Sequence, residues 1–303
     1  MRRVIFSKTF SGRAVDRKLV VLGSLVAAAC QTVGVPRAPI SVTAVAVPVV
    51  EAVDVVRAAA PSSTSPRVSE TRGLWVVRST LVHPDSVRAM VARAADAGFN
   101  TLLVQVRGRG DAYYSGGIEP RADGIQGGPT FDPLALTVRE AHARGIEVHA
   151  WMNVHLISSA SVISSEPTHL ANERPELLAV PRELAGELYD VDPASPRYVE
   201  RLVEHALANR SQIEGLYSSP SAPEIKERVF SVATDLVERY EIDGIHLDYV
   251  RYPRGDFDYS RGATDRFRTW IEERITDDQR AEFTVARERG PFALVEAFPD
   301  AWA

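Results

Sequence analysis

Asp248 ends a short segment whose residue types could support acid–base or nucleophilic chemistry. In residues 242–249 apolar side chains alternate with His246 and Asp248, and Pro253 follows, which predicts a β-strand with polar groups near its carboxyl end. The catalytic groups of α/β barrels lie at the carboxyl ends of strands. We therefore interpret Asp248 as a candidate catalytic carboxylate. The alternative is that Asp248 pairs with Arg251 or caps a turn.

Two other predicted strands carry polar side chains with the same alternation. Gln105 and Arg107 share a face of one strand, and Trp151 and Asn153 share a face of the next. Each pair can therefore project into a common cleft. Amide and guanidinium groups hydrogen-bond to sugar hydroxyls and an indole stacks on sugar rings, so these residues are candidate substrate-binding residues. For Trp151 the alternative is an aromatic side chain of the core.

Tyr249 and Arg251 follow Asp248 and are expected at the mouth of the same cleft. A guanidinium close to a carboxylate favours its ionised form, so Arg251 would hold Asp248 in the state that suits a nucleophile or a base. His149 and His246 lie deeper in their strands and are interpreted as core histidines. No group of residues has the spacing of metal ligands, and the sequence predicts neither a metal nor another cofactor.

Strand and helix patterns alternate from Arg72 onward. Predicted strands cover residues 73–78, 100–107, 146–153 and 242–249. Predicted helices begin at Pro84, after Asp132, at Pro196 and near Pro223, and a helical tail follows Ser260. This alternation predicts right-handed βαβ units and a parallel sheet. Because no glycine-rich dinucleotide motif follows the first strand, a barrel is favoured over a nucleotide-binding open sheet.

The composition fits a folded protein with a slightly acidic net charge. The chain has 303 residues, of which 45% are hydrophobic and 25% charged, with 35 Lys plus Arg against 40 Asp plus Glu and a pI of about 5.9. A nucleic-acid-binding protein needs a basic face. We therefore do not expect a nucleic acid as partner.

The first 30 residues have the order of an export signal. Basic residues from Arg2 to Lys18 precede an apolar run, Leu19 to Ala29, that is shorter than the ~20 residues of a membrane-spanning helix. Cys30, the only cysteine, follows a run of alanines, where bacterial lipoprotein signals place the lipidated residue. Lipidation of Cys30 and ordinary cleavage near these alanines are both open. We expect an exported protein of the cell envelope, held by a lipid anchor if Cys30 is modified.

Residues 31–70 are rich in Pro, Ala and Ser and lack any helical or strand period, which predicts a flexible linker. Residues 71–303 form the predicted globular domain.

Stretches of this domain resemble, in order and spacing, the bacterial glycosyl hydrolase-like family 10. They are Arg72-Gly-Leu-Trp75, Gly98-Phe-Asn-Thr-Leu-Leu-Val-Gln105-Val-Arg107, His149-Ala-Trp151-Met-Asn153 and Asp243-Gly-Ile-His-Leu-Asp248-Tyr-Val-Arg-Tyr-Pro253. The resemblance covers roughly residues 71–260. It implies a (β/α)8 barrel, exported or membrane-tethered, that hydrolyses a cell-envelope or extracellular polysaccharide. Relatives with known activity cleave peptidoglycan glycan strands, which makes these strands the expected substrate.

The chain differs from this family in the number of strands. A complete barrel uses about 250 residues and eight strands, whereas the patterns here predict four strands and a helical tail. We therefore expect the first half of a (β/α)8 TIM-barrel type fold, from a fragment, a prematurely ended frame or a half completed by a partner. The alternative function is a non-catalytic, tethered glycan-binding protein or an inactive remnant. By itself the chain is expected to show little turnover.

Cleavage of a glycosidic bond normally uses two carboxyl groups about 5–9.5 Å apart, so Asp248 needs a second carboxylate. Asp111, in the loop after the second strand, is the candidate, unless it is a turn aspartate satisfied by nearby backbone. Asp243 begins its strand and is a poor candidate. Family-18 chitinases have a similar strand with a catalytic glutamate two residues after the last aspartate. Val250 occupies that position here, which argues against their substrate-assisted mechanism.

Overall fold

The computed structural model describes residues 70–302, which belong to the unit Ser65–Ala303. The predictions for residues 1–69, including the export signal, Cys30 and almost all of the linker, lie outside the described residues. In chain order the described elements are β1 (Gly73–Val76), the 3-10 helix η1 (Arg78–Val82), α1 (Pro84–Asp96), β2 (Thr101–Arg107), α2 (Pro133–His142), β3 (Glu147–Asn153), β4 (Leu156–Ser159), α3 (Leu170–Glu173), the 3-10 helix η2 (Pro175–Leu177), α4 (Arg182–Leu188), α5 (Pro196–Ala208), β5 (Gly215–Tyr217), α6 (Pro223–Arg239), β6 (Gly244–Asp248), α7 (Arg261–Glu272), α8 (Arg280–Arg289), α9 (Pro291–Ala297) and α10 (Pro299–Trp302).

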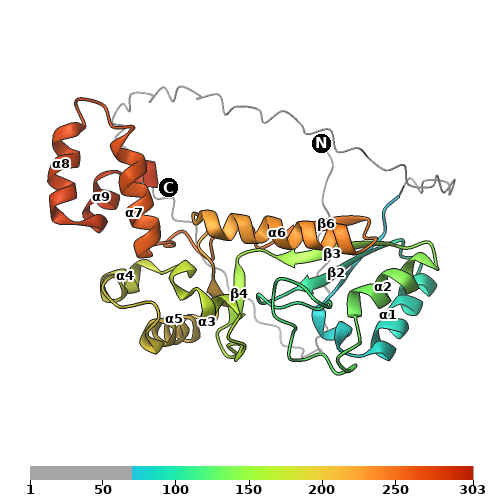
Figure 1. Cartoon of the computed structure of the whole chain (residues 1–303). Helices are drawn as coiled ribbons and strands as arrows, with labels where there is room; N and C mark the ends of the chain where they lie inside the picture. The colour runs from blue at the N-terminus through green and yellow to red at the C-terminus, as the bar shows by residue number, and fades with distance from the viewer. Residues whose placement is uncertain (1–69, 303) are drawn as a thin grey trace, which may run out of the picture. The chain divides into compact units, whose positions relative to one another are not determined.

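The main sheet contains four strands in the order β1-β2-β3-β6, and every neighbouring pair is parallel. Helices α1, α2 and α6 precede β2, β3 and β6 along the chain, so each of these strands completes a βα crossover. Figure 1 shows β2, β3 and β6 side by side, with α6 running along the sheet. The predicted α/β fold with parallel strands is confirmed, and this strand order agrees with a partial barrel.

Local capping explains where the crossover helices begin and end. Pro84 opens α1, and the ring of His83 accepts a hydrogen bond from the Asp85 backbone N–H. Asp132 caps α2 by accepting from the Ala135 N–H at 3.0 Å. Gly98 follows α1 with a φ of 78°, a left-handed conformation that glycine adopts without steric cost.

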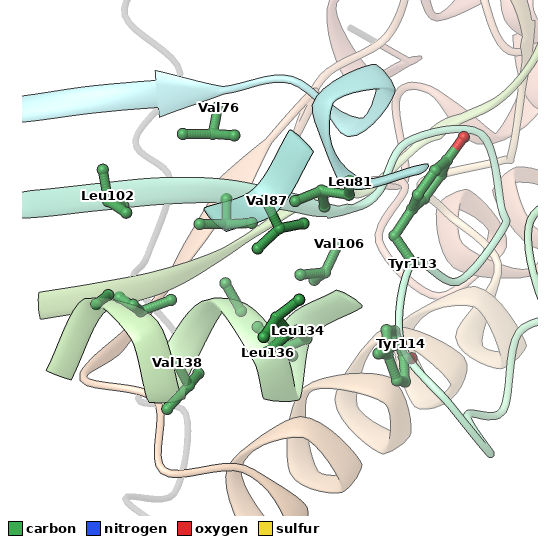
Figure 2. Close-up of a cluster of buried hydrophobic side chains, with 14 of the residues drawn as sticks. Val76, Leu81, Val87, Leu102, Val106, Tyr113, Tyr114, Leu134, Leu136 and Val138 are labelled. Carbon is green, nitrogen blue, oxygen red and sulfur yellow. The ribbon is translucent and has the colours of Figure 1, made fainter. Parts of the chain in front are cut away.

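A hydrophobic core fills the space between one face of the sheet and helices α1, α2 and α6. Figure 2 shows Val87 of α1 and Leu134 of α2 beside Val106 of β2. Fully buried Val232 and Leu236 bring α6 into the same cluster. Every second side chain along each strand faces this core, and the side chains between them lie on the opposite face of the sheet.

The opposite face of the sheet is lined by Trp75, Leu103, Trp151 and His246. Trp75 pairs with Leu103 and Trp151 pairs with His246, and these two pairs lie two residues apart along the strands. The rings of Trp75 and His246 have centroids 6.0 Å apart, although their strands are the two edges of the sheet. The sheet is therefore strongly curled, and we call this its concave face.

A second, antiparallel sheet pairs β4 with β5 and was not predicted from the sequence. It packs with α3, α4, α5 and part of α6 through a separate hydrophobic cluster that includes Ile157, Leu202 and Leu216. The helical tail predicted after Ser260 is present as α7 to α10, and it has its own core around Phe267. No helix within residues 70–302 combines the length and the hydropathy needed to cross a membrane.

Candidate active site

Asn153 and Asp248 are register partners at the carboxyl ends of β3 and β6. The pairing continues past the strands, because the backbone N–H of Val154 donates to the Asp248 carbonyl at 2.7 Å. The Asp248 side chain accepts a hydrogen bond from the Tyr249 N–H at 2.7 Å through Oδ1. Tyr249 has a φ of 55°, so this bond supports a left-handed turn. Within residues 70–302 the other carboxylate oxygen, Oδ2, forms no hydrogen bond with the protein.

Asn153, the register partner of Asp248, and Gln105 on β2 are 1% and 4% exposed. The Gln105 amide donates to Asn153 Oδ1 at 3.4 Å, and the Asn153 amide donates to the Gly108 carbonyl at 3.0 Å. Gln105 Oε1 accepts from the backbone and guanidinium N–H groups of Arg78. Both amides therefore have protein partners that fix their orientation, and Arg78 becomes part of the site.

Arg107 differs from the expected arrangement, in which it shared a face with Gln105. A register shift between the two residues brings Arg107 opposite Met152, whose side chain lies in the core. The guanidinium is 2% exposed, pairs with Glu119 at 2.8 Å, and donates to the carbonyls of Asn153 and Val154. We infer that Arg107 positions the end of β3. The burial of its guanidinium does not support the predicted contact between Arg107 and a substrate, which stays a prediction.

Glu119 joins Arg107 to helix α6. Its side chain is completely buried and also binds Arg228 at 2.8 Å. Burial raises the pKa of Glu119, but the two arginines lower it more, so the net pKa lies below the usual glutamate value. This ionised triad fixes the loop after β2 against the carboxyl ends of β3 and β6, at Asn153 and Asp248, which we call the rim. Sequence reasoning missed Glu119 because no strand or motif marks it.

Tyr249 and Arg251 contact each other directly after β6, and their expected place at the mouth of a cleft stays a prediction. The Arg251 guanidinium lies over the Tyr249 ring, 4.7 Å from its centroid, and forms no ion pair with Asp248 in the described part of the chain. The Tyr249 hydroxyl donates to Glu214 at 2.5 Å, and the pKa of Tyr249 is raised by burial and by this carboxylate. Glu214, directly before the unpredicted strand β5, is a further acidic group at the rim that sequence reasoning missed.

Trp151 lies on the concave face with its ring 6.3 Å from that of His246. Its indole N–H is buried and has no hydrogen-bond partner among residues 70–302. Trp75, on the other side of His246, is 58% exposed. The three rings give the concave face an aromatic floor of the type on which sugar rings stack.

Asp111 accepts hydrogen bonds from the Gly108 and Arg109 backbone N–H groups at 3.1 and 2.8 Å, both through Oδ1. This is the geometry of a turn aspartate. Its side chain nevertheless lines a cavity of about 290 Å³ next to the loop after β2. Asp243, at the other end of β6, binds the Val148 N–H and the His142 ring, far along the strand from Asp248.

His155 follows β3 and is 8% exposed. Its Nδ1 lies 3.1 Å from the Ser218 hydroxyl. Burial, together with the charge of Arg107, lowers the pKa of His155 to about 4, so the imidazole is neutral at pH 7. Within residues 70–302 no cluster of His, Cys, Asp and Glu side chains has the arrangement of a metal site.

The structure places a carboxylate, two amides and an aromatic surface at the carboxyl ends of parallel strands. Comparison with protein families finds a match between the model of Glycosyl hydrolase-like 10 and residues 70–210, which supports a glycoside hydrolase-like protein. This match confirms the resemblance predicted from the sequence motifs.

Two named relatives carry the same kind of description. The chain is 28% identical over 215 residues to glycosyl hydrolase DigH of Escherichia coli (strain K12), which covers 63% of this chain and 44% of DigH. It is 27% identical over 162 residues to glycosyl hydrolase YngK of Bacillus subtilis (strain 168), which covers 52% of this chain and 26% of YngK. The chain therefore spans less than half the length of either relative. Among solved structures, alpha-L-fucosidase isoenzyme 2 from Paenibacillus thiaminolyticus aligns with a TM-score of 0.43 at 16% identity, over 75% of this chain and 30% of the fucosidase.

Proposed function

We propose that the protein hydrolyses glycosidic bonds in a polysaccharide of the cell envelope or the extracellular space, with peptidoglycan glycan strands as the first candidate substrate. The observation that supports this most is the pairing of Asn153 with Asp248 at the carboxyl ends of adjacent parallel strands. The match to a glycosyl hydrolase-like family supports the reaction class.

In this proposal Asp248 is the reacting carboxylate. Its Oδ2 has no protein partner in the described residues and is available to a substrate, while Oδ1 is held by the Tyr249 N–H. Gln105, Arg107 and Asn153 position the rim, and Trp151 supports the sugar ring. Two side chains are candidates for the second carboxylate: Asp111, as expected from the sequence, and Glu214, which is hydrogen-bonded to the Tyr249 hydroxyl.

The substrate is tested by incubating the protein with purified peptidoglycan glycan strands, chitin oligomers and a neutral glucan, and by identifying the products by mass spectrometry. The proposal expects new reducing ends from one of the amino-sugar polymers. Activity confined to the glucan would contradict the proposed substrate and leave the reaction class intact.

Export and lipid attachment are part of the same proposal and are supported by the order of charged, apolar and small residues before Cys30. Cell fractionation of the unaltered protein and of Cys30→Ala tests both points. We expect the unaltered protein with the membranes and the variant released from them. A variant that stays membrane-bound would contradict lipidation, and a cytosolic unaltered protein would contradict export.

A second candidate is a tethered glycan-binding protein without catalysis. The observation in its favour is that Asp111, the second carboxylate expected from the sequence, accepts two backbone hydrogen bonds of a turn, which is the structural role that the sequence left open. Glycan binding with no reducing ends released, in both the unaltered protein and Asp248→Asn, would support this candidate.

A further inference from the structure

A cavity of about 290 Å³ lies at the loop after β2, beside the rim that carries Asp248. Its lining includes Arg78, Arg109 and Arg121 together with Asp111 and Asp123. A cavity of this size is at the lower end of the range for small-molecule sites and suits a single sugar residue. With three arginines and two aspartates, the lining has one formal positive charge in excess.

Arg78 and Arg109 line the same cavity, and neither has an anionic partner among the described residues. The guanidinium of Arg78 donates to the neutral amide oxygen of Gln105, and neither arginine forms an ion pair within residues 70–302. The Nε of Arg109 is buried and has no hydrogen-bond partner in the part of the chain that the structure describes. Burial and the charge of Arg78 lower the pKa of Arg109, although Glu214 and other acidic groups act in the opposite direction.

Such a pair is costly in a folded protein unless a ligand compensates for it. Half-buried cations that line one cavity repel each other, and a buried N–H without an acceptor loses its hydration. Arg121 differs, since its guanidinium is used by the Phe131 and Gly128 carbonyls and holds the loop in place. Arg78 and Arg109 therefore face the cavity as cations whose charge no carboxylate of the described residues pairs with directly.

We propose that Arg78 and Arg109 form a subsite for a carboxylate carried by a sugar residue of the substrate. A planar guanidinium donates two parallel hydrogen bonds to a carboxylate, which suits this group better than a neutral hydroxyl. Asp111 and Asp123 in the same lining oppose a dianion such as phosphate and favour a ligand with a single charge. Tyr113 also lines the cavity, with its hydroxyl close to Arg78. The subsite rests on the proposed function, because it adds the charge of the substrate to a glycan site.

Two kinds of sugar supply this group: a uronic acid, with the carboxylate on the ring, and an amino sugar with a lactyl ether. Binding of glucuronic acid and of N-acetylmuramic acid to the full chain, measured by calorimetry or ligand-observed NMR, distinguishes them. Their matched neutral probes are glucose and N-acetylglucosamine. One of the acids is expected to bind at least about tenfold tighter than its neutral counterpart, since charge-assisted hydrogen bonds are the strong ones. The methyl ester of that acid should lose the preference, and this comparison needs no protein variant.

The protein side is tested with Arg109→Gln, Arg78→Gln and the control Arg93→Gln, which lies on the surface of α1 outside the cavity lining. The first two variants should abolish the preference for the acid, while the control keeps it. The subsite is refuted if acid and neutral sugars bind equally, if the methyl ester binds as tightly as the acid, if both cavity variants retain the preference, or if inorganic phosphate displaces the acid sugar at equal concentration. If a neutral amino sugar binds as tightly as its acid, the subsite alone is refuted. If none of the sugars binds, the result counts against the proposed function as well.

Discussion

The rings of Trp75 and His246 are 6.0 Å apart across the concave face, although β1 and β6 are separated by two intervening strands. In a flat sheet these strands would be roughly 14 Å apart. The short distance between the rings therefore reflects the curl of the sheet. Trp75, His246 and Trp151 together form the aromatic floor beside Asp248.

If sugars stack on this floor, an oligosaccharide should change the intrinsic fluorescence of the protein. Trp151→Ala is expected to weaken binding by about 2–10-fold, which corresponds to the loss of one aromatic contact. Trp270→Ala, a change on the exposed side of α7, is the matched control. Equal loss of binding in both variants would show that the effect is not specific to the concave face.

The buried triad of Arg107, Glu119 and Arg228 predicts a large effect from a small change. Glu119→Gln removes the only charge that compensates two arginines within the triad, so the free energy of unfolding should fall by about 3–5 kcal/mol. Urea denaturation measures this difference. The control is Glu140→Gln, which breaks a partly exposed i,i+4 pair with Arg144 and should cost less than about 1 kcal/mol. Similar losses in both variants would contradict the role of the triad.

Glu119 also predicts part of the acid sensitivity. Its folded pKa lies below the ordinary value, so its contribution to stability is complete above the unfolded-state pKa of about 4.3 and is lost as the pH falls through the lower folded value. Glu119→Gln should therefore show a shallower loss of stability below pH ~4.3 than the unaltered protein. Parallel curves for the two proteins in this range would contradict the assignment.

His155 acts in a different pH window. Its pKa is lowered from 6.5 to about 4, so the unfolded chain binds a proton between these values that the folded chain does not. The folded state should lose about 3 kcal/mol as the pH falls from 6.5 to 4, and none of this loss occurs above pH ~6.5. NMR titration of the imidazole gives the pKa directly. A midpoint near 6.5 would show that the ring is not held neutral by burial.

The second sheet can be tested through Gly215. A Cβ at this position would lie 1.8 Å from the Ser158 carbonyl oxygen, so Gly215→Ala must push β5 away from β4. We expect a loss of about 1–3 kcal/mol in the free energy of unfolding, measured in urea. At Gly186 in α4 an added Cβ would meet no atom within 4 Å, and Gly186→Ala should be neutral or stabilising by about 0.5–1 kcal/mol. Equal losses in the two variants would contradict the close approach of β5 to β4.

The sequence predicted the parts of the fold that have a strong local signal. The four parallel strands, and the helices after Pro84, Asp132, Pro196 and Pro223, follow from alternation, apolar stripes and capping residues, and their ends differ by only a few residues. Strands β4 and β5 were not predicted because each is short and has too few residues to show a period. Their pairing depends on a contact between segments far apart in the chain.

The site was predictable where it depends on strand phase. Asn153 and Asp248 are neighbours because parallel strands end at one edge of the sheet. The face on which the Arg107 side chain lies depends on a β-bulge, and no residue type in the sequence predicts that bulge. Glu214 and the Arg78–Arg109 pair come from loops and a short helix whose positions depend on tertiary packing. Spacing along the chain carries no information about such contacts.

The central claim is that Asp248 reacts with the glycan, and one measurement tests it directly: the rate at which glycan strands acquire new reducing ends. The longest open reading frame that contains this chain is compared with its Asp248→Asn and Asp243→Asn variants, the latter changing a carboxylate at the opposite end of the same strand. Asp248→Asn should lower the rate by at least about 10²–10⁴-fold, the size of an acid–base contribution, with glycan binding retained. Asp243→Asn should keep most of the activity. An Asp248→Asn protein that cleaves glycan at the unaltered rate would contradict the account.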